Sequence, residues 1–285
     1  MKIFYFIALC LVLQGAGSLA GQETLHKASR ADERSFGKGI SRITVYGEKA
    51  SVTVKGWSGS EVKVLLRPVS RNRDREQAIA DLKYIHYSAE KENDNLVVRN
   101  SFKGKLEQIT SNLSMEIEIY MPASLPAEIT NLYGPVEISN LACATAVVSF
   151  GSLKITNIST ECRVTTRYSD MELNSIRGVL LVNGEKSDIL ATDLTAATTI
   201  NCSYGEADLG VSGTGPFTVK GYRTAVEIIV KDFDDYSYSL KAPHGTIKLP
   251  DGRQIRNEPA EIRHANAAGF VDVTTSYCDI TVSTK

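Results

Sequence analysis

The sequence predicts an all-β protein wound as a β-solenoid with coils of about 18 residues. A two-residue marker recurs through 128–209 with this nearly constant period. Short runs of alternating apolar and polar residues fill the intervals, with no helix-length segment between them. The markers are Tyr133-Gly134, Phe150-Gly151, Tyr168-Ser169, Lys186-Ser187 and Tyr204-Gly205.

Mostly apolar residues keep fixed distances from each marker. Those at plus three and plus five point inward together, because strand side chains alternate between faces. One unit cannot bury its apolar pair alone, so we expect stacking at about 4.8 Å with a shared core. The inward pairs are Val136/Ile138, Leu153/Ile155, Met171/Leu173, Ile189/Ala191 and Ala207/Leu209. Further core positions are Leu141, Ile158, Ile176 and Leu194 at plus eight, and Ile129, Ala146, Val164, Val182 and Ile200 at minus four.

Two kinds of residue predict the corners of each coil. At marker plus seven stand Asn140, Asn157, Ser175 and Asp193. Asn and Asp tolerate a left-handed backbone and hydrogen-bond their own turn, which suits a stacked corner. For the second corner we expect positive φ at the marker glycines, Gly134, Gly151 and Gly205.

Residues 1–20 have the pattern of a secretory signal peptide. Lys2 precedes the apolar run Ile3–Leu13, and Ser18-Leu19-Ala20 predicts cleavage after Ala20. The alternatives are a buried N-terminal helix and a lipid anchor at Cys10, which the bulky Leu9 disfavours. We therefore expect an exported protein, in the periplasm, at the cell surface or secreted.

The rest of the chain is expected to form one domain, 41–285, after a flexible polar leader at 21–40. Irregular coils at 41–127 would precede the regular repeat at 128–209. The spacing of Ile79, Leu82 and Ile85/His86 predicts a short helix near 73–86 over one open end of the stack. Looser coils at 210–285 would follow, with a protruding polar loop at 251–268.

Charge and cysteine content limit the partners and the covalent chemistry. A net charge of −1 indicates no general attraction to nucleic acid or an anionic membrane, and no later segment approaches the roughly 20 apolar residues of a membrane span. Cys143 and Cys162 are separated by one period plus one residue and are the candidate disulfide on neighbouring coils, while Cys202 and Cys278 occupy other phases. The alternative is that all four are buried free thiols.

The chain resembles a known family in its strand motifs. An extended strand ending Ile119-Tyr120-Met121-Pro122 precedes tandem Tyr/Phe-Gly-x-Val-x-Ile units, as in the bacterial DUF4097 family of adhesin-like β-strand-repeat proteins. The resemblance covers residues 41–285 and implies a right-handed, single-stranded β-helix with a role in surface attachment. The Lys186 unit and the stretch 251–268 depart from the regular repeat.

Signatures of catalysis and of metal or cofactor binding are not found. The four histidines show no paired spacing, and no Cys-x-x-Cys is present, so we expect no catalytic residues, metal or cofactor. The glycine-rich run at 210–215 lacks a phosphate-binding order and is interpreted as a turn.

Two repeated sets of side chains are candidates for function. An aromatic column is either an outward platform for sugar rings or a corner ladder that packs on itself, which we favour; its members are Tyr133, Phe150, Tyr168, Tyr204 and Tyr222. A set of carboxylates is either a solvated outer face, which we favour, or a glycosidase-like pair or Ca²⁺ site; its members are Asp170, Glu172, Asp188, Glu206 and Asp208.

The function predicted is a non-catalytic exported module that presents a repetitive face to an unidentified glycan or protein. The alternative is a polysaccharide-active β-helix lyase or hydrolase, which would need a cleft walled by long loops. Residues 251–268 offer such a wall, with Arg253, Arg256, Glu258, Glu261, Arg263 and His264. Neither the binding residues nor the oligomeric state is assigned by the sequence.

Overall fold

The computed structural model describes residues 25–104 and 109–285, and over these ranges the protein is all-β, as predicted. The one α-helix in the described ranges is α1 (Arg75–Asp81), which continues into the 3-10 turn η1 (Leu82–Tyr84). A second short 3-10 turn is η3 (Phe233–Asp235). The expected signal peptide, residues 1–20, lies outside the described residues. No helix of the described part has the length and apolar character to cross a bilayer.

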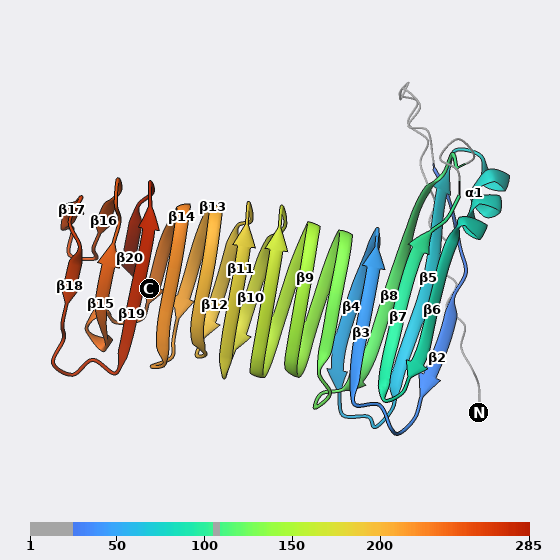
Figure 1. The fold of residues 1–285 in the computed structure, drawn as a ribbon, viewed down its shortest axis with the longest axis horizontal. Helices are drawn as coiled ribbons and strands as arrows, with labels where there is room; N and C mark the ends of the chain where they lie inside the picture. Colours follow the sequence, from blue (N-terminus) through green and yellow to red (C-terminus); the bar gives the residue numbers. More distant parts are fainter. Residues whose placement is uncertain (1–24, 105–108) are drawn as a thin grey trace, which may run out of the picture.

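The strands form one elongated row, with β1–β8 at one end and β15–β18 at the other (Figure 1). They are β1 (His26–Ser29), β2 (Asp32–Phe36), β3 (Arg42–Glu48), β4 (Ala50–Trp57), β5 (Val62–Asn72), β6 (Ile85–Glu92), β7 (Asn95–Phe102), β8 (Asn112–Pro122), β9 (Ala127–Arg167), β10 (Asp170–Ile176), β11 (Val179–Glu185), β12 (Ile189–Leu194), β13 (Ala197–Val211), β14 (Pro216–Val230), β15 (Tyr236–Lys241), β16 (Thr246–Lys248), β17 (Gln254–Arg256), β18 (Ala260–Ile262), β19 (Gly269–Ser276) and β20 (Ile280–Thr284).

The strands in the middle of the row pair in parallel at an offset of one repeat. Leu153 pairs with Met171, Met171 with Ile189, and Ile189 with Ala207, each one full period further along the chain. Strands β9 and β13 each bend at a corner and pair on two faces, so the parallel pairings of β9, β10, β12, β13 and β11 form a closed ring. The predicted period is therefore the distance in sequence between paired strands.

The core lies inside this row, where the periodicity placed it. The predicted inward pairs are all buried, with exposed fractions from 0 to 3%. The positions at marker plus eight and minus four are buried equally well. Because each apolar column continues from one coil to the next, burial depends on neighbours that are distant in sequence.

Both corners require a left-handed backbone, but the positive φ predicted for the marker glycines of the second corner is confirmed only at Gly134, with φ of 145°, and is wrong for Gly151 and Gly205. Asn140, Asn157, Ser175 and Asp193 have φ of 54–59°, as expected for the first corner. At the second corner the marker residue itself is left-handed, with φ of 62° at Tyr133 and 57° at Phe150. The marker glycines have another role. A Cβ at Gly151 would lie 2.1 Å from the carbonyl oxygen of Gly134, because neighbouring coils approach closely there.

At the N-terminal end, two predictions need correction. The flexible leader expected at 21–40 is wrong for His26–Ser29 and Asp32–Phe36, because β1 and β2 pair antiparallel with β5. This edge is also held by an ion pair between Lys27 Nζ and Glu116 Oε1 at 3.0 Å. Around residues 41–127 the coils are not purely parallel, since β5 pairs antiparallel with β8 and β6 with β7.

The predicted helix is real but shorter than 73–86. Asp74 caps it, with Oδ1 accepting from the backbone N–H of Glu76 at 2.8 Å. Ile79 on this helix is 56% exposed, so the apolar spacing did not mark a buried face. Ile85 begins β6 and pairs with Phe102. Helix α1 packs beside β1 and β5 at the N-terminal end, where β1 and β2, rather than the helix, pair along β5.

At the C-terminal end, residues 251–268 are not a protruding loop. They contain β17, antiparallel to β16, and β18, antiparallel to β15. Ala260 of β18 is buried and joins the core. These short antiparallel strands lie at the end of the row, where they pair with parallel strands that would otherwise have an open edge.

Candidate binding surface

One corner of the coils carries a continuous line of exposed rings and cations, which we call the corner column. Its members share a left-handed backbone, an exposed side chain and equivalent positions in successive coils. In stacking order they are Lys49, Tyr133, Phe150, Tyr168, Lys186, Tyr204, Arg223, Tyr277 and His244.

The corner column confirms most of the predicted aromatic column and changes one member. Tyr222 is not at the corner, although it follows Tyr204 by one full period. The offset between paired residues is 17 at Leu194 and Val211 but 19 at Thr198 and Phe217, so the turn between Val211 and Phe217 holds two extra residues and Arg223 takes the left-handed position. Tyr222 instead lies beside the column, with its ring 5.5 Å from that of Tyr204. Lys49, Lys186, Arg223, Tyr277 and His244 were not included in the predicted aromatic column.

The rings pack on each other, so the self-packing ladder is confirmed. The centroid of Phe150 lies 5.2 Å from Tyr133 and 5.1 Å from Tyr168, with interplanar angles of 21° and 8°. Lys186 Nζ sits 4.6 Å from the centroid of Tyr168 and donates to its hydroxyl at 2.7 Å. Arg223 lies 5.6–5.9 Å from the rings of Tyr204, Tyr222 and Tyr277. The column is thus a cation–π and stacked assembly whose outer edge faces solvent.

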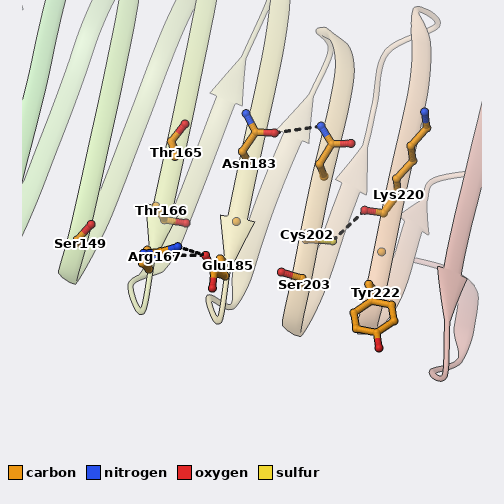
Figure 2. A pocket seen from close by; sticks show the side chains of 13 residues that line it. Ser149, Thr165, Thr166, Arg167, Asn183, Glu185, Cys202, Ser203, Lys220 and Tyr222 are labelled. Atoms are coloured by element: carbon orange, nitrogen blue, oxygen red, sulfur yellow. Dashed lines mark hydrogen bonds and ion pairs between the residues drawn. The ribbon is translucent and has the colours of Figure 1, made fainter.

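A groove of about 640 Å³ runs beside the column across successive coils (Figure 2). The bottom of the groove is formed by the backbone of β9, β11, β13 and β14. Its two sides are formed by outward-facing side chains, which stand one and three positions before the corner-column residue of each coil. One side carries Thr165, Asn183, Asn201 and Lys220, and the other Ser149, Arg167, Glu185, Ser203 and Tyr222.

The polar groups of the groove are partly tied to each other from coil to coil. Asn201 Nδ2 donates to Asn183 Oδ1 at 3.0 Å. Arg167 Nη2 pairs with Glu185 Oε2 at 2.7 Å, and both side chains remain about half exposed. Thr166, which also lines the groove, is 2% exposed, and its hydroxyl has no hydrogen-bond partner in the described part of the chain. The groove was missed in the sequence; its signal was the run of Thr and Asn three residues before successive markers.

The predicted carboxylates lie on the other side of the corner column, along a separate hollow of about 530 Å³. Asp170 Oδ1 accepts from the backbone N–H of Asp188 at 3.3 Å, and Asp188 Oδ1 from that of Glu206 at 2.9 Å. These carboxylates therefore cap the neighbouring coil. Burial, together with the charges of Glu227 and Asp188, raises the pKa of Asp208.

The exposure of these carboxylates agrees with the prediction that they form a solvated outer face. Glu172, for example, is half exposed and pairs with Lys154 at 2.8 Å. Within 25–104 and 109–285, no three His, Cys, Asp or Glu side chains gather so that they could hold a metal ion.

The candidate disulfide between Cys143 and Cys162 is not formed. Both are free thiols, as are Cys202 and Cys278. Cys162 is fully buried, whereas Cys143 is half-buried, and Ala144 rather than Cys143 is the buried residue one period before Cys162. A spacing of one period plus one residue therefore places the two side chains on different sides of the strand wall.

Thiol labelling of the native protein tests this arrangement. Burial raises the pKa of Cys162 to about 12 and, offset in part by a hydrogen bond, that of Cys202 to about 11. We expect a maleimide at pH 8 to modify Cys143 and to spare Cys162 and Cys202 until the protein is unfolded. Peptide mapping by mass spectrometry reads the result. A Cys143–Cys162 cross-linked peptide would contradict it.

Comparisons with known proteins give structural neighbours only. The chain matches no family model and no curated protein, so its resemblance to the DUF4097 family rests on the sequence motifs. A solved structure from Bacteroides fragilis, described as a "putative adhesin", has a TM-score of 0.48 and 12% identity, covering 89% of this chain and 97% of its own. One from Parabacteroides distasonis, also described as a "putative adhesin", has a TM-score of 0.42 and 8% identity, covering 90% of this chain and 97% of its own.

A third neighbour, from the same Parabacteroides distasonis strain, is described as a lipid binding protein. Its TM-score is 0.36 at 12% identity, covering 89% of this chain and 96% of its own. With identities and TM-scores this low, the function has to be argued from the surface of this chain.

Proposed function

We propose that this protein is an exported, non-catalytic binding module, an adhesin of the cell surface or periplasm, whose groove holds a linear glycan along the row of coils. The observation that carries the proposal is the groove itself, which crosses five successive coils and receives at least one polar side chain from each of them. A site with the repeat of the coils suits a ligand that repeats as well. We further infer that the coils wind as a right-handed, single-stranded β-helix: the one-repeat parallel offset supports the single-stranded winding, and the resemblance of the strand motifs implies the right hand.

The chemistry of the groove suits hydroxyl groups. Thr165, Asn183, Asn201 and Ser203 offer donors and acceptors without net charge. Their spacing follows the coils, at about 4.8 Å per step, which is comparable to the length of one sugar unit. A sugar hydroxyl can make the same hydrogen bonds to these amides as the water molecule that it displaces. A polar, half-open groove is therefore compatible with glycan binding.

The polysaccharide-active enzyme is the alternative function, and the placement of the carboxylates favours the binding module over it. The groove contains one carboxylate, Glu185, which is paired with Arg167. The other repeated acids lie across the corner column, where Asp170 and Asp188 accept hydrogen bonds from backbone N–H groups. Within 251–268, Gln254–Arg256 and Ala260–Ile262 form strands at the end of the row, and the residues between them line a hollow of about 540 Å³ with one carboxylate, Glu258. These placements support binding without catalysis.

A pair of matched variants tests the groove. We expect the double variant Asn183→Ala/Asn201→Ala to bind at least about tenfold more weakly to any glycan that the wild-type protein binds. Each amide is expected to contribute roughly 1 kcal/mol to the free energy of binding. The control is Asn174→Ala, which removes a similar coil-to-coil hydrogen bond, Asn174 Nδ2 to Thr192 Oγ1 at 2.9 Å, outside the groove.

Binding is measured by glycan array and then by calorimetry on the retained glycans, with thermal melts for all variants. An equal loss in Asn174→Ala, or no retention of any glycan, contradicts the proposal. Release of new reducing ends or of unsaturated uronic acid from a polymer establishes the enzyme instead.

A further inference from the structure

We infer that the glycan held by this groove is an acidic polysaccharide, whose carboxylate or sulfate groups pair with the cations of the corner column and of the groove. The inference rests on the proposed function and adds the chemical class of the ligand. It is carried by three cations within three consecutive coils, Lys186, Arg223 and Lys220, and by the orientation of the rings beside them.

The stacked rings leave their edges, not their faces, to the ligand. Both faces of Phe150 are covered, by Tyr133 and by Tyr168. The ammonium group of Lys186 lies at the hydroxyl end of Tyr168, 2.7 Å from the oxygen and 4.6 Å from the ring centroid. Since an aromatic ring is negative on its face and positive at its edge, a column stacked in this way presents positive edges to solvent. The faces in the stack of Tyr133, Phe150 and Tyr168 therefore do not offer a platform for a neutral sugar, and the edges of this stack favour negative groups.

The cations of this corner have no carboxylate partner. Lys186 bonds to the hydroxyl of Tyr168, Arg223 lies among three tyrosine rings, and no ion pair is formed by either, or by Lys220, within the described ranges. Elsewhere on the coils, basic residues do pair, as Lys154 does with Glu172 and Lys248 with Asp279. Aromatic contacts hold Lys186 and Arg223 in place without neutralising them, so a ligand anion can pair with a cation that is already positioned.

The far side of the column limits the shape of the ligand. Asp170, Asp188 and Glu206 stand two residues past the corner in three consecutive coils, and all three are exposed or half-exposed. A flat anionic membrane laid on the column would meet these carboxylates, whereas a thin chain lying in the groove would not. Single-stranded nucleic acid would need open ring faces on which to stack its bases, and both faces of Phe150, in the middle of the stack, are covered.

The test compares one polymer backbone with and without its charge. Polygalacturonate, alginate and heparan sulfate are titrated into the wild-type full chain, together with polygalacturonate whose carboxylates are fully methyl-esterified. We expect at least one acidic polymer to bind, and esterification of a bound polygalacturonate to weaken binding at least about tenfold, because charge-assisted hydrogen bonds are roughly twice as strong as neutral ones. We also expect affinity to fall steeply as salt is raised.

The double variant Lys186→Gln/Arg223→Gln should bind the acidic polymer with an affinity at least about tenfold lower than the wild type. Most of the dependence of this affinity on salt concentration should be lost as well. The control, Lys154→Gln/Lys248→Gln, removes the same two charges from positions that are paired with Glu172 and Asp279. It should change affinity less than about twofold. Thermal melts of both variants confirm that the fold is retained, and only variants that melt near the wild type are compared.

Each other outcome overturns the inference in a recognisable way. Equal binding of neutral and acidic polymers, or equal loss in both double variants, removes the anionic class but leaves glycan binding by the groove intact. Retention of no polysaccharide removes both the inference and the proposed function. Binding of phosphatidylserine vesicles or of single-stranded oligothymidylate, with none of an acidic polysaccharide, would assign the cations to a membrane or a nucleic acid instead.

Discussion

Replacing Ile155 by Asp is expected to prevent folding or to lower the free energy of unfolding by several kcal/mol. Ile155 is 0% exposed and lies in the inward column one repeat from Leu173, with which it pairs across the coils. A carboxylate there has no cation or hydrogen-bond donor to meet it, and an uncompensated buried charge is among the costliest changes a core can receive. Chemical denaturation followed by circular dichroism measures the loss.

The control for Ile155 is the charge reversal Glu172→Lys on the adjacent coil. Glu172 alternates with the buried Met171 and Leu173, and its side chain is 46% exposed beside Lys154. The reversal breaks one exposed ion pair and brings two ammonium groups together, which should cost no more than about 1 kcal/mol. If Glu172→Lys proved the more damaging of the two, the inward and outward faces of the coils would be assigned the wrong way round.

A single methyl group added at Gly151 is the second change expected to have a large effect. In Gly151→Ala the new Cβ lies 2.1 Å from the carbonyl oxygen of Gly134 on the preceding coil, and 2.8 Å from its carbonyl carbon. Backbone atoms cannot move aside as a flexible side chain can, so the two coils must separate locally. We expect a loss of about 1–3 kcal/mol, the usual cost of overpacking a well-packed interior, read from thermal and denaturant melts.

Gly184→Ala is the matched control, in the same stack of coils. Its added Cβ would have its nearest contact at 3.5 Å, with the terminal methyl of Met171. The alanine also restricts the unfolded chain, so stability should stay the same or rise by up to about 1 kcal/mol. Equal damage by the two substitutions would show that the coils near Gly151 are not in close contact, and would place the requirement for glycine elsewhere.

The two changes also bear on binding, because Gly151 follows Phe150 in the corner column. Separation of the coils at Gly151 would disturb the stacking of Phe150 on Tyr133 and Tyr168. The cations proposed to meet the ligand are held by the same column, two and four coils further on. The regular spacing of the coils is therefore both the source of stability and the feature that sets the distances between the binding groups.

The repeat of apolar residues was sufficient to predict the all-β class, the inward columns and the first corner. Strand side chains alternate strictly, so Ile155 and Leu173 could be assigned to the interior from spacing alone. The Asn and Asp corners followed for a similar reason, since few residues accept a left-handed backbone and the same position recurs in each coil.

Contacts between segments far apart in the sequence decided the rest. The pairing of β1 and β2 depends on β5, a partner distant along the chain, so residues 26–36 looked like a flexible leader. Extra residues in the turn between Val211 and Phe217 raised the offset between paired residues to 19 and placed Arg223, not Tyr222, at the corner. Cys143 and Cys162 lie on opposite faces of the strands because strand side chains alternate, the same rule that predicted the core. One residue more than a full period turns the second side chain to the other face.

The groove and the cation-bearing column are likewise properties of the stacked coils. Thr165, Asn183 and Asn201 are polar residues of ordinary appearance in a strand, and nothing local distinguishes them as a surface. Lys186 interrupted the aromatic markers in the sequence and looked like a defect of the repeat. In the structure it caps the stacked rings, because parallel coils place equivalent residues about 5 Å apart, within the range of a cation–π contact. The sequence determined what each coil contains, and stacking decided which side chains act together.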